Sequence, residues 1–204
     1  MTHGWTAACG SFLCACLVVL ACPVQAEDQP TAPVPTAVFD VHALLGGKYL
    51  NSSDWGSTDN QFEYGGEFDF QPASWPVALN VGYYRGQDLG VFNFKSTTQE
   101  FQLGIKKFWP TGQLGRAFVG GGLTIAKGTA EAPSDSTAIN GHTSYQPGGW
   151  VSGGYLFSLG RHFDIGVDLK YSYAEAKLKG SGGNSGQNID VGGLHVAGVL
   201  GYRW

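Results

Sequence analysis

Cysteine is scarce in this sequence, and it is confined to the beginning of the chain. The four cysteines of the 204 residues are Cys9, Cys14, Cys16 and Cys22. All of them lie in a segment that has the pattern of an export signal, so its removal would leave a chain without any thiol. This excludes disulfide bonds, thiol catalysis and thiolate metal sites in the mature protein.

Long apolar runs are scarce as well. The run at residues 12–21, FLCACLVVLA, is shorter than the roughly 20 residues that a membrane-spanning helix needs. It has the length of a secretory signal core, and VQA at 24–26 supplies a small-residue cleavage site. We therefore expect a cleaved signal peptide at 1–26, with lipidation of Cys22 as the less favoured alternative. A flexible, proline-rich periplasmic lead-in follows at 27–36.

Positive charge is in deficit. Twelve lysines and arginines stand against sixteen acidic residues, for a formal net charge of -4. A nucleic-acid partner that needs many contacts from lysine and arginine to phosphate is therefore not expected. His42, His142, His162 and His195 lie on separate segments without ligand spacing, so the sequence predicts neither a metal nor another cofactor.

Alternation with a period of two dominates from residue 37 onward, and a helical period never replaces it. In QFEYGGEFDF, residues 61–70, aromatic residues occupy one parity and mostly acidic residues the other. Segments 100–109 and 163–173 repeat the pattern, which is typical of strands with one apolar and one charged face. The expected strands are 37–50, 61–70, 76–85, 100–109, 116–127, 145–157, 163–173 and 189–204.

The connections between these strands are alternately long and short, as in transmembrane barrels. We therefore predict an all-β fold, an eight-stranded antiparallel up-and-down transmembrane β-barrel over residues 37–204. Both termini and the tight turns would face the periplasm. A soluble barrel of the lipocalin type, with its apolar face turned inward, is the main alternative. The long loops, expected to face outward, are 51–60, 86–96, 128–144 and 179–188.

Aromatic residues near both ends of the expected strands favour the membrane barrel. Two such belts, about ten residues apart along each strand, match the length of a tilted spanning strand with interfacial girdles. Glycine pairs inside strands, such as Gly153-Gly154, indicate a tightly curved wall. The belt near the turns comprises Phe70, Trp75, Trp109, Phe157, Phe163 and Trp204, and the belt near the loops comprises Tyr49, Tyr83 and Tyr173.

The chain ends on an apolar strand with an aromatic last residue, GGLHVAGVLGYRW. The stretch from Asp190 to Trp204 resembles the closing strand of small barrels related to outer membrane protein X, the Ail-type adhesins and the outer membrane protein A barrel. That strand typically ends in Gly-Tyr-Arg-Phe, and here Gly201, Tyr202 and Arg203 match while Trp204 replaces phenylalanine. The resemblance implies a location in the cell outer membrane, with Tyr202, Arg203 and Trp204 as the signal for the barrel-assembly machinery.

The face opposite the apolar one carries a set of charges, which we call the lumen charge network. The interior of an eight-stranded barrel is just wide enough for side chains to fill it, so opposite charges should interlock there as a plug. A narrow gated pore, sensitive to protons through His42 and His195, is the alternative. The network comprises Asp40, His42, Lys48, Glu63, Glu67, Asp69, Glu100, Lys106, Asp164, Asp168, Lys170, His195 and Arg203.

Three cations on the lipid-facing parity lie at the ends of strands that run toward the expected extracellular loops: Arg85, Lys127 and Lys177. At the extracellular rim they could bind lipopolysaccharide phosphates through charge-assisted hydrogen bonds, or simply extend to water. We expect a monomer surrounded by outer-membrane lipid and lipopolysaccharide.

A hydrolytic site is a further alternative, because His142 and Ser144 are two residues apart and Glu175 could supply a carboxylate. Such residues are ordinary in loops, and we expect no catalytic site. The sequence thus predicts a structural or surface-interaction, adhesin-like role through four loops. A narrow channel for small solutes and a lipid A hydrolase are the second and third choices, and a surface ligand is a conceivable partner.

Overall fold

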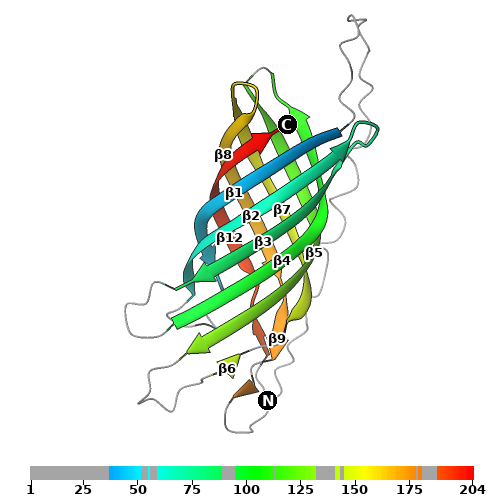
Figure 1. Cartoon of the computed structure of the whole chain (residues 1–204). Coiled ribbons are helices and arrows are strands. Elements are labelled where there is room, and N and C mark those ends of the chain that lie inside the picture. The colour runs from blue at the N-terminus through cyan, green and yellow to red at the C-terminus, as the bar shows by residue number, and fades with distance from the viewer. Residues whose placement is uncertain are drawn as a thin grey trace, which may run out of the picture. The chain divides into compact units, whose positions relative to one another are not determined.

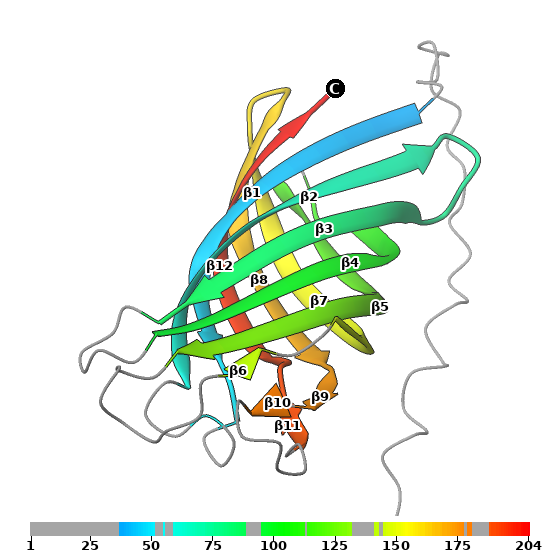
Figure 2. The ribbon, with the colours of Figure 1, turned by 60° about the horizontal axis from the view of Figure 1, so that its bottom comes forward.

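Eight long strands form a closed antiparallel barrel in a computed structural model of the chain (Figures 1 and 2). The structure describes residues 37–51, 55, 59–88, 95–112, 114–131, 141–142, 145–177, 179–180 and 188–204. The expected signal peptide and lead-in lie outside the described residues. The wall strands are β1 (Ala37–Tyr49), β2 (Asn60–Pro72), β3 (Ala78–Gln87), β4 (Lys95–Pro110), β5 (Gly115–Glu131), β7 (Gln146–Leu159), β8 (Phe163–Tyr173) and β12 (Gly193–Arg203).

Each wall strand pairs with two neighbours, so the sheet has no open edge. The order runs from β5 through β4, β3 and β2 to β1, then through β12 and β8 to β7, which pairs with β5. The seam between the first and last strands pairs Asp40 with Arg203 and Tyr49 with Leu194. The predicted eight-stranded up-and-down barrel is confirmed. No helix in the described part of the chain is long and apolar enough to cross a membrane.

The two ends of the barrel differ. The turn end carries the tight connections at 73–77, 111–114 and 160–162, two of which contain a glycine with positive φ, Gly112 at 73° and Gly160 at 84°. A side chain is disfavoured in this conformation, which glycine adopts at little cost. The loop end carries four short strands (Figure 2): β6 (Gly141–His142), β9 (Glu175–Lys177), β10 (Lys179–Gly180) and β11 (Asn188–Asp190).

Several expected boundaries were wrong at the loop end. β4 and β5 continue together to the pair Lys95 and Glu131, so the expected loops 86–96 and 128–144 are too long. Threonines sustain the pairing there, since β-branched residues suit a strand. The last expected strand, 189–204, is interrupted instead, because the Asp190 carboxylate accepts a hydrogen bond from the Gly192 backbone at 2.8 Å. This local bond competes with the ladder, and β11 pairs with β9.

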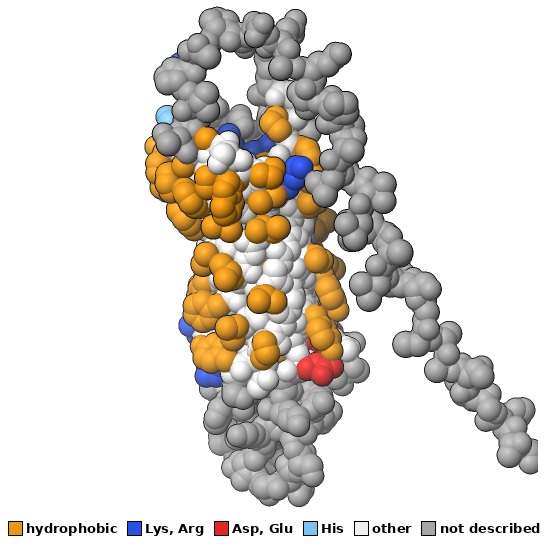
Figure 3. Space-filling model, turned by 90° about the vertical axis from the view of Figure 1, so that its right-hand side faces the viewer, with side chains coloured by type: hydrophobic (Ala, Val, Ile, Leu, Met, Phe, Trp, Pro, Cys, Tyr) orange, Lys and Arg blue, Asp and Glu red, His pale blue; other side chains and the backbone are white. Residues whose placement is uncertain are grey.

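Burial alternates along the wall strands, with charge inside and apolar side chains outside. In β1, Leu44 is 2% exposed and its neighbour Leu45 is 61% exposed. Figure 3 shows hydrophobic side chains over the outer wall, gathered toward both ends. The buried set, in contrast, contains Asp, Glu, Lys and His from most wall strands. This arrangement is the reverse of a soluble barrel and matches a wall that faces lipid.

Substitution of Gly154 tests how tightly β7 and β8 approach one another. A Cβ at Gly154 would lie 2.1 Å from the Val167 carbonyl oxygen and 2.7 Å from the Phe118 ring. We expect Gly154→Ala to lower the free energy of unfolding by about 1–3 kcal/mol, measured by urea unfolding in phospholipid vesicles. Gly153→Ala is the matched control, since its Cβ would meet atoms no closer than 3.5 Å. Equal stability of the two variants would contradict the close approach.

Candidate functional site

The lumen is filled by side chains in layers, beginning with a clamp of two arginines and two aspartates at the turn end. Arg116 of β5 donates to Asp40 of β1 at 2.8 Å and to Asp164 of β8 at 2.9 Å. Arg203 of β12 donates to the same carboxylates at 3.0 and 2.9 Å. The Arg116 guanidinium also lies 4.3 Å from the centroid of the Phe108 ring. Because β1 and β5 are opposite in the strand order, Arg116 ties the two sides of the barrel together.

Glu67 of β2 is the hub of the central layer. It accepts hydrogen bonds from Lys106 of β4, from Tyr84 of β3 and, at 3.3 Å, from Lys170 of β8. The Lys170 ammonium also lies 3.3 Å from the centroid of the Tyr84 ring. All four side chains are buried. Charged donors and acceptors bind most strongly where water is excluded, so this layer ties β3, β4 and β8 to the carboxylate on β2.

The third layer lies nearer the loop end. Lys48 of β1 donates to Glu100 of β4 and, at 2.8 Å, to the Val191 carbonyl. The His195 ring of β12 contacts the Glu63 carboxylate through Nδ1 at 2.7 Å and the Ser172 hydroxyl through Nε2 at 2.9 Å. Each charged group here has an oppositely charged or polar partner, which offsets much of the cost of its burial.

An apolar cluster lies between this layer and the loop end of the barrel. The Trp55 indole nitrogen donates to the Asp190 carbonyl at 2.6 Å, which fixes the ring beside the start of β12. The cluster therefore joins the segment after β1 to the segment before β12, directly over Lys48. Its members are Leu50, Trp55, Ala126, Ala174 and Val191, all buried.

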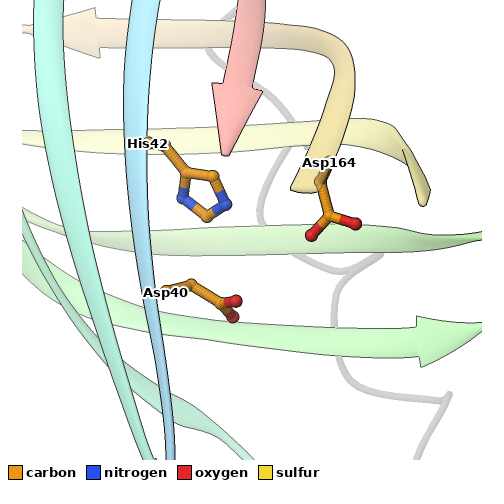
Figure 4. Close-up of side chains that lie close together, drawn as sticks. All are labelled: Asp40, His42 and Asp164. Carbon is orange, nitrogen blue, oxygen red and sulfur yellow. The ribbon is translucent and has the colours of Figure 1, made fainter. Parts of the chain in front are cut away.

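Both ring nitrogens of His42, a member of the lumen charge network, are buried without an aligned hydrogen bond among the described residues. Its Nδ1 lies 3.2 Å from an Asp69 oxygen, but the geometry is not that of a hydrogen bond. Figure 4 shows its ring close to Asp40 and Asp164, and the ligand atoms of these three residues lie within 4.8 Å of one another. The sequence interpretation did not foresee this grouping. Both carboxylates are already held by Arg116 and Arg203, so an ion-pair network suits the site better than a metal centre.

The described lumen contains seven carboxylates, five lysine or arginine cations and two histidines. The space at the centre, between His42, Lys106 and Leu156, is too narrow for a water molecule. The carboxylates are Asp40, Glu63, Glu67, Asp69, Glu100, Asp164 and Asp168, the cations are Lys48, Lys106, Lys170, Arg116 and Arg203, and the histidines are His42 and His195.

The structure places all thirteen residues of the lumen charge network inside the barrel. Twelve are buried, and Arg203 at the turn end keeps 31% of its side chain exposed. Sequence reasoning missed Arg116, which has the inward parity of β5 but lies in a glycine-rich strand with weak alternation. It also missed Tyr84, the inward member of a Tyr-Tyr pair, although the glycines at 82 and 86 share its parity.

The structure describes some, but not all, of the residues predicted at the extracellular rim and considered for a hydrolytic site. Arg85 and Lys127 lie half-buried on the outer wall near the loop end, whereas the side chain of Lys177 lies outside the described part. Ser144 is also outside the described residues. Glu175 accepts a hydrogen bond from Tyr173, and His142 pairs through its backbone with Thr129 and Lys179.

Known proteins match this chain in structure. No family model matches it, and neither does any curated protein sequence. The crystal structure of Neisserial surface protein A aligns with a TM-score of 0.55 at 11% identity, covering 82% of this chain and 96% of that one. The N-terminal β-barrel domain of Pseudomonas aeruginosa OprF aligns at 0.51 with 18% identity, covering 83% and 98%.

A third structure has a similar fold. Ail, the attachment invasion locus protein of Yersinia pestis, aligns with a TM-score of 0.50 at 8% identity, covering 82% of this chain and 97% of that one. At such identities the likeness is one of fold. The chain therefore has the fold of the small eight-stranded outer-membrane β-barrels.

Proposed function

We propose that this chain is an integral outer-membrane protein with a structural or surface-interaction role, exerted through its loop end. The observation that carries the proposal is the inverted distribution of side chains. Apolar residues such as Leu103, Leu123 and Val151 are each at least 60% exposed on the wall, while the ionisable residues of the lumen, except Arg203, are buried. In water this exposed apolar wall would cause aggregation, whereas in a bilayer the same side chains contact lipid acyl chains.

The filled lumen argues against the channel alternative. Ion pairs cross it in three layers, and the cluster around Trp55 covers the layer nearest the loop end. A solute would have to break several charge-assisted hydrogen bonds at once to pass. The role therefore belongs to the surfaces. The small sheet of β9 and β11 projects past the wall at the loop end (Figure 2), where a partner could reach it.

The closing seam suits assembly by the barrel-assembly machinery. Trp204 and Phe39 exchange backbone hydrogen bonds of 3.1 and 3.2 Å, and their rings stack with centroids 5.8 Å apart. The described barrel has no unpaired wall edge, so a monomer is complete in itself.

Heat-modifiable migration of protein extracted from outer membranes tests the proposal. We expect the unboiled full chain to run as a compact band in the membrane fraction, and a chain lacking Trp204 to assemble poorly. A soluble periplasmic protein would refute the proposal.

Planar-bilayer recording of the folded chain separates the plug from the pore. We expect no conductance steps, because ion pairs cross the described part of the lumen in three layers. Steps that also appear with the sample buffer alone would be an artefact. Steps that require the folded, heat-modifiable protein would establish the channel instead.

A further inference from the structure

A row of polar and aromatic side chains crosses the outer wall near the loop end. The strand register places Arg85 of β3 opposite Gln99 of β4, and Gln99 opposite Lys127 of β5. Tyr64 of β2 pairs with Arg85 at one end of the row, and Tyr145 lies beside Lys127 at the other. These residues have the lipid-facing parity of their strands, so all five lie in one row across the outer wall, inclined to the membrane plane by the tilt of the strands.

Contacts within the row hold its side chains on the surface. The Lys127 ammonium lies 5.6 Å from the centroid of the Tyr145 ring, and the Tyr145 hydroxyl donates to the Gln99 amide oxygen at 3.4 Å. The Gln87 amide, oriented with its oxygen toward Arg85, accepts from the guanidinium at 2.8 and 3.1 Å. The two cations are thus positioned on either side of Gln99 without being neutralised.

The next outward-facing row of the wall, on the side away from the loop end, is apolar. Tyr83 and Phe101 have ring centroids 4.8 Å apart, and Ile125 follows Phe101 in the register. The cations therefore stand at the boundary between an apolar wall and the loops. No carboxylate with a described side chain forms an ion pair with Arg85 or Lys127. With no carboxylate of the described residues paired to them, the two cations are free to bind an anion at this boundary.

We propose that Arg85, Gln99 and Lys127 form a binding site for one phosphate group of an outer-leaflet glycolipid, whose acyl chains lie against Tyr83 and Phe101. Strands are about 4.8 Å apart, so the two cation-bearing backbones are about 10 Å apart, and both long side chains can reach one phosphate above Gln99. This inference rests on the proposed outer-membrane location and adds a lipid partner to it.

Native mass spectrometry of the full chain folded in detergent, titrated with diphosphorylated lipid A, tests the site. We expect the double substitution Arg85→Gln with Lys127→Gln to weaken lipid A binding about tenfold, as expected from the loss of about 1.4 kcal/mol of charge-assisted bonding. Fully dephosphorylated lipid A should bind the unaltered chain about as weakly as the intact lipid binds this variant.

Lys107→Gln with Arg161→Gln is the matched control, because it removes the same charge at the turn end, where Lys107 lies over the Trp109 ring. Figure 3 shows Lys and Arg side chains near both ends of the wall. The control should bind as the unaltered chain does. An equal loss in both variants, no loss in either, or indifference to the lipid phosphates would overturn the site. A heat-modifiable band from each variant shows that the barrel itself is folded, so failure of the site is distinguishable from failure of the proposed function.

Discussion

Replacement of Glu67 with alanine is expected to lower the free energy of unfolding by about 3–5 kcal/mol, since it strands buried charges. Glu67 accepts from Lys106, Lys170 and Tyr84 at the centre of the lumen. Without it, the ion pairs that remain to the two lysines among the described residues are longer, 3.7 Å from Lys106 to Asp69 and 3.8 Å from Lys170 to Asp168. The measurement is urea unfolding of the folded barrel in phospholipid vesicles.

Two further variants serve as comparisons for Glu67→Ala. Glu67→Gln keeps the volume and one acceptor but removes the charge, so its loss should be smaller than that of the alanine variant. Glu175→Ala removes a carboxylate whose partner, Tyr173, is exposed at the loop end, and it should change stability by less than about 1 kcal/mol. If Glu67→Ala were as stable as Glu175→Ala, the central layer would not be a cooperative network.

The alternation of side chains predicts the wall and its contents because a strand has only two faces. In β2 and β8 the acidic residues share one parity, so a single choice of the outward face places Glu67 and Asp168 inside together. The aromatic belts make that choice, since a soluble barrel has no reason to collect large aromatic residues at both ends of its strands. Phe163 and Trp204, both more than half exposed, show the turn-end belt directly.

The partners of the buried charges could not be read from the same pattern. Asp40 and Arg116 are 76 positions apart and lie on opposite strands of the barrel. Their contact depends on the stagger of eight strands, which local periodicity does not encode. Arg116 was missed for a second reason. Glycines occupy both parities of β5 around it, so the strand offers little contrast between its two faces.

The ends of the strands were also beyond local reasoning. The segment from Lys95 to Gln99 is polar enough to suggest a loop, yet it pairs with the extended end of β5. Cross-strand bonds decide its conformation, because the backbone groups of a paired strand are satisfied whatever its side chains are. The break at Val191 has the opposite origin, a single carboxylate at Asp190 that bonds to the backbone locally.

Replacement of Arg116 with methionine is expected to cost about 3 kcal/mol of unfolding free energy, because it removes one of two cations from a buried pair of aspartates. Methionine keeps much of the contact with the Phe108 ring, so the change reports mainly on charge. Arg203→Met should cost only about 1 kcal/mol, since that side chain is 31% exposed and solvent can partly replace it.

The double variant distinguishes a clamp from two separate pairs. Each arginine donates to both Asp40 and Asp164, so each one partly compensates for the loss of the other. The combined loss should therefore exceed the sum of the single losses by about 1 kcal/mol in urea unfolding of protein folded without cellular machinery. Simple additivity would mean that the aspartates are independent. Because Arg203 also belongs to the predicted assembly signal, an assembly defect in cells that exceeds its loss of stability in vitro would separate the two roles of this residue.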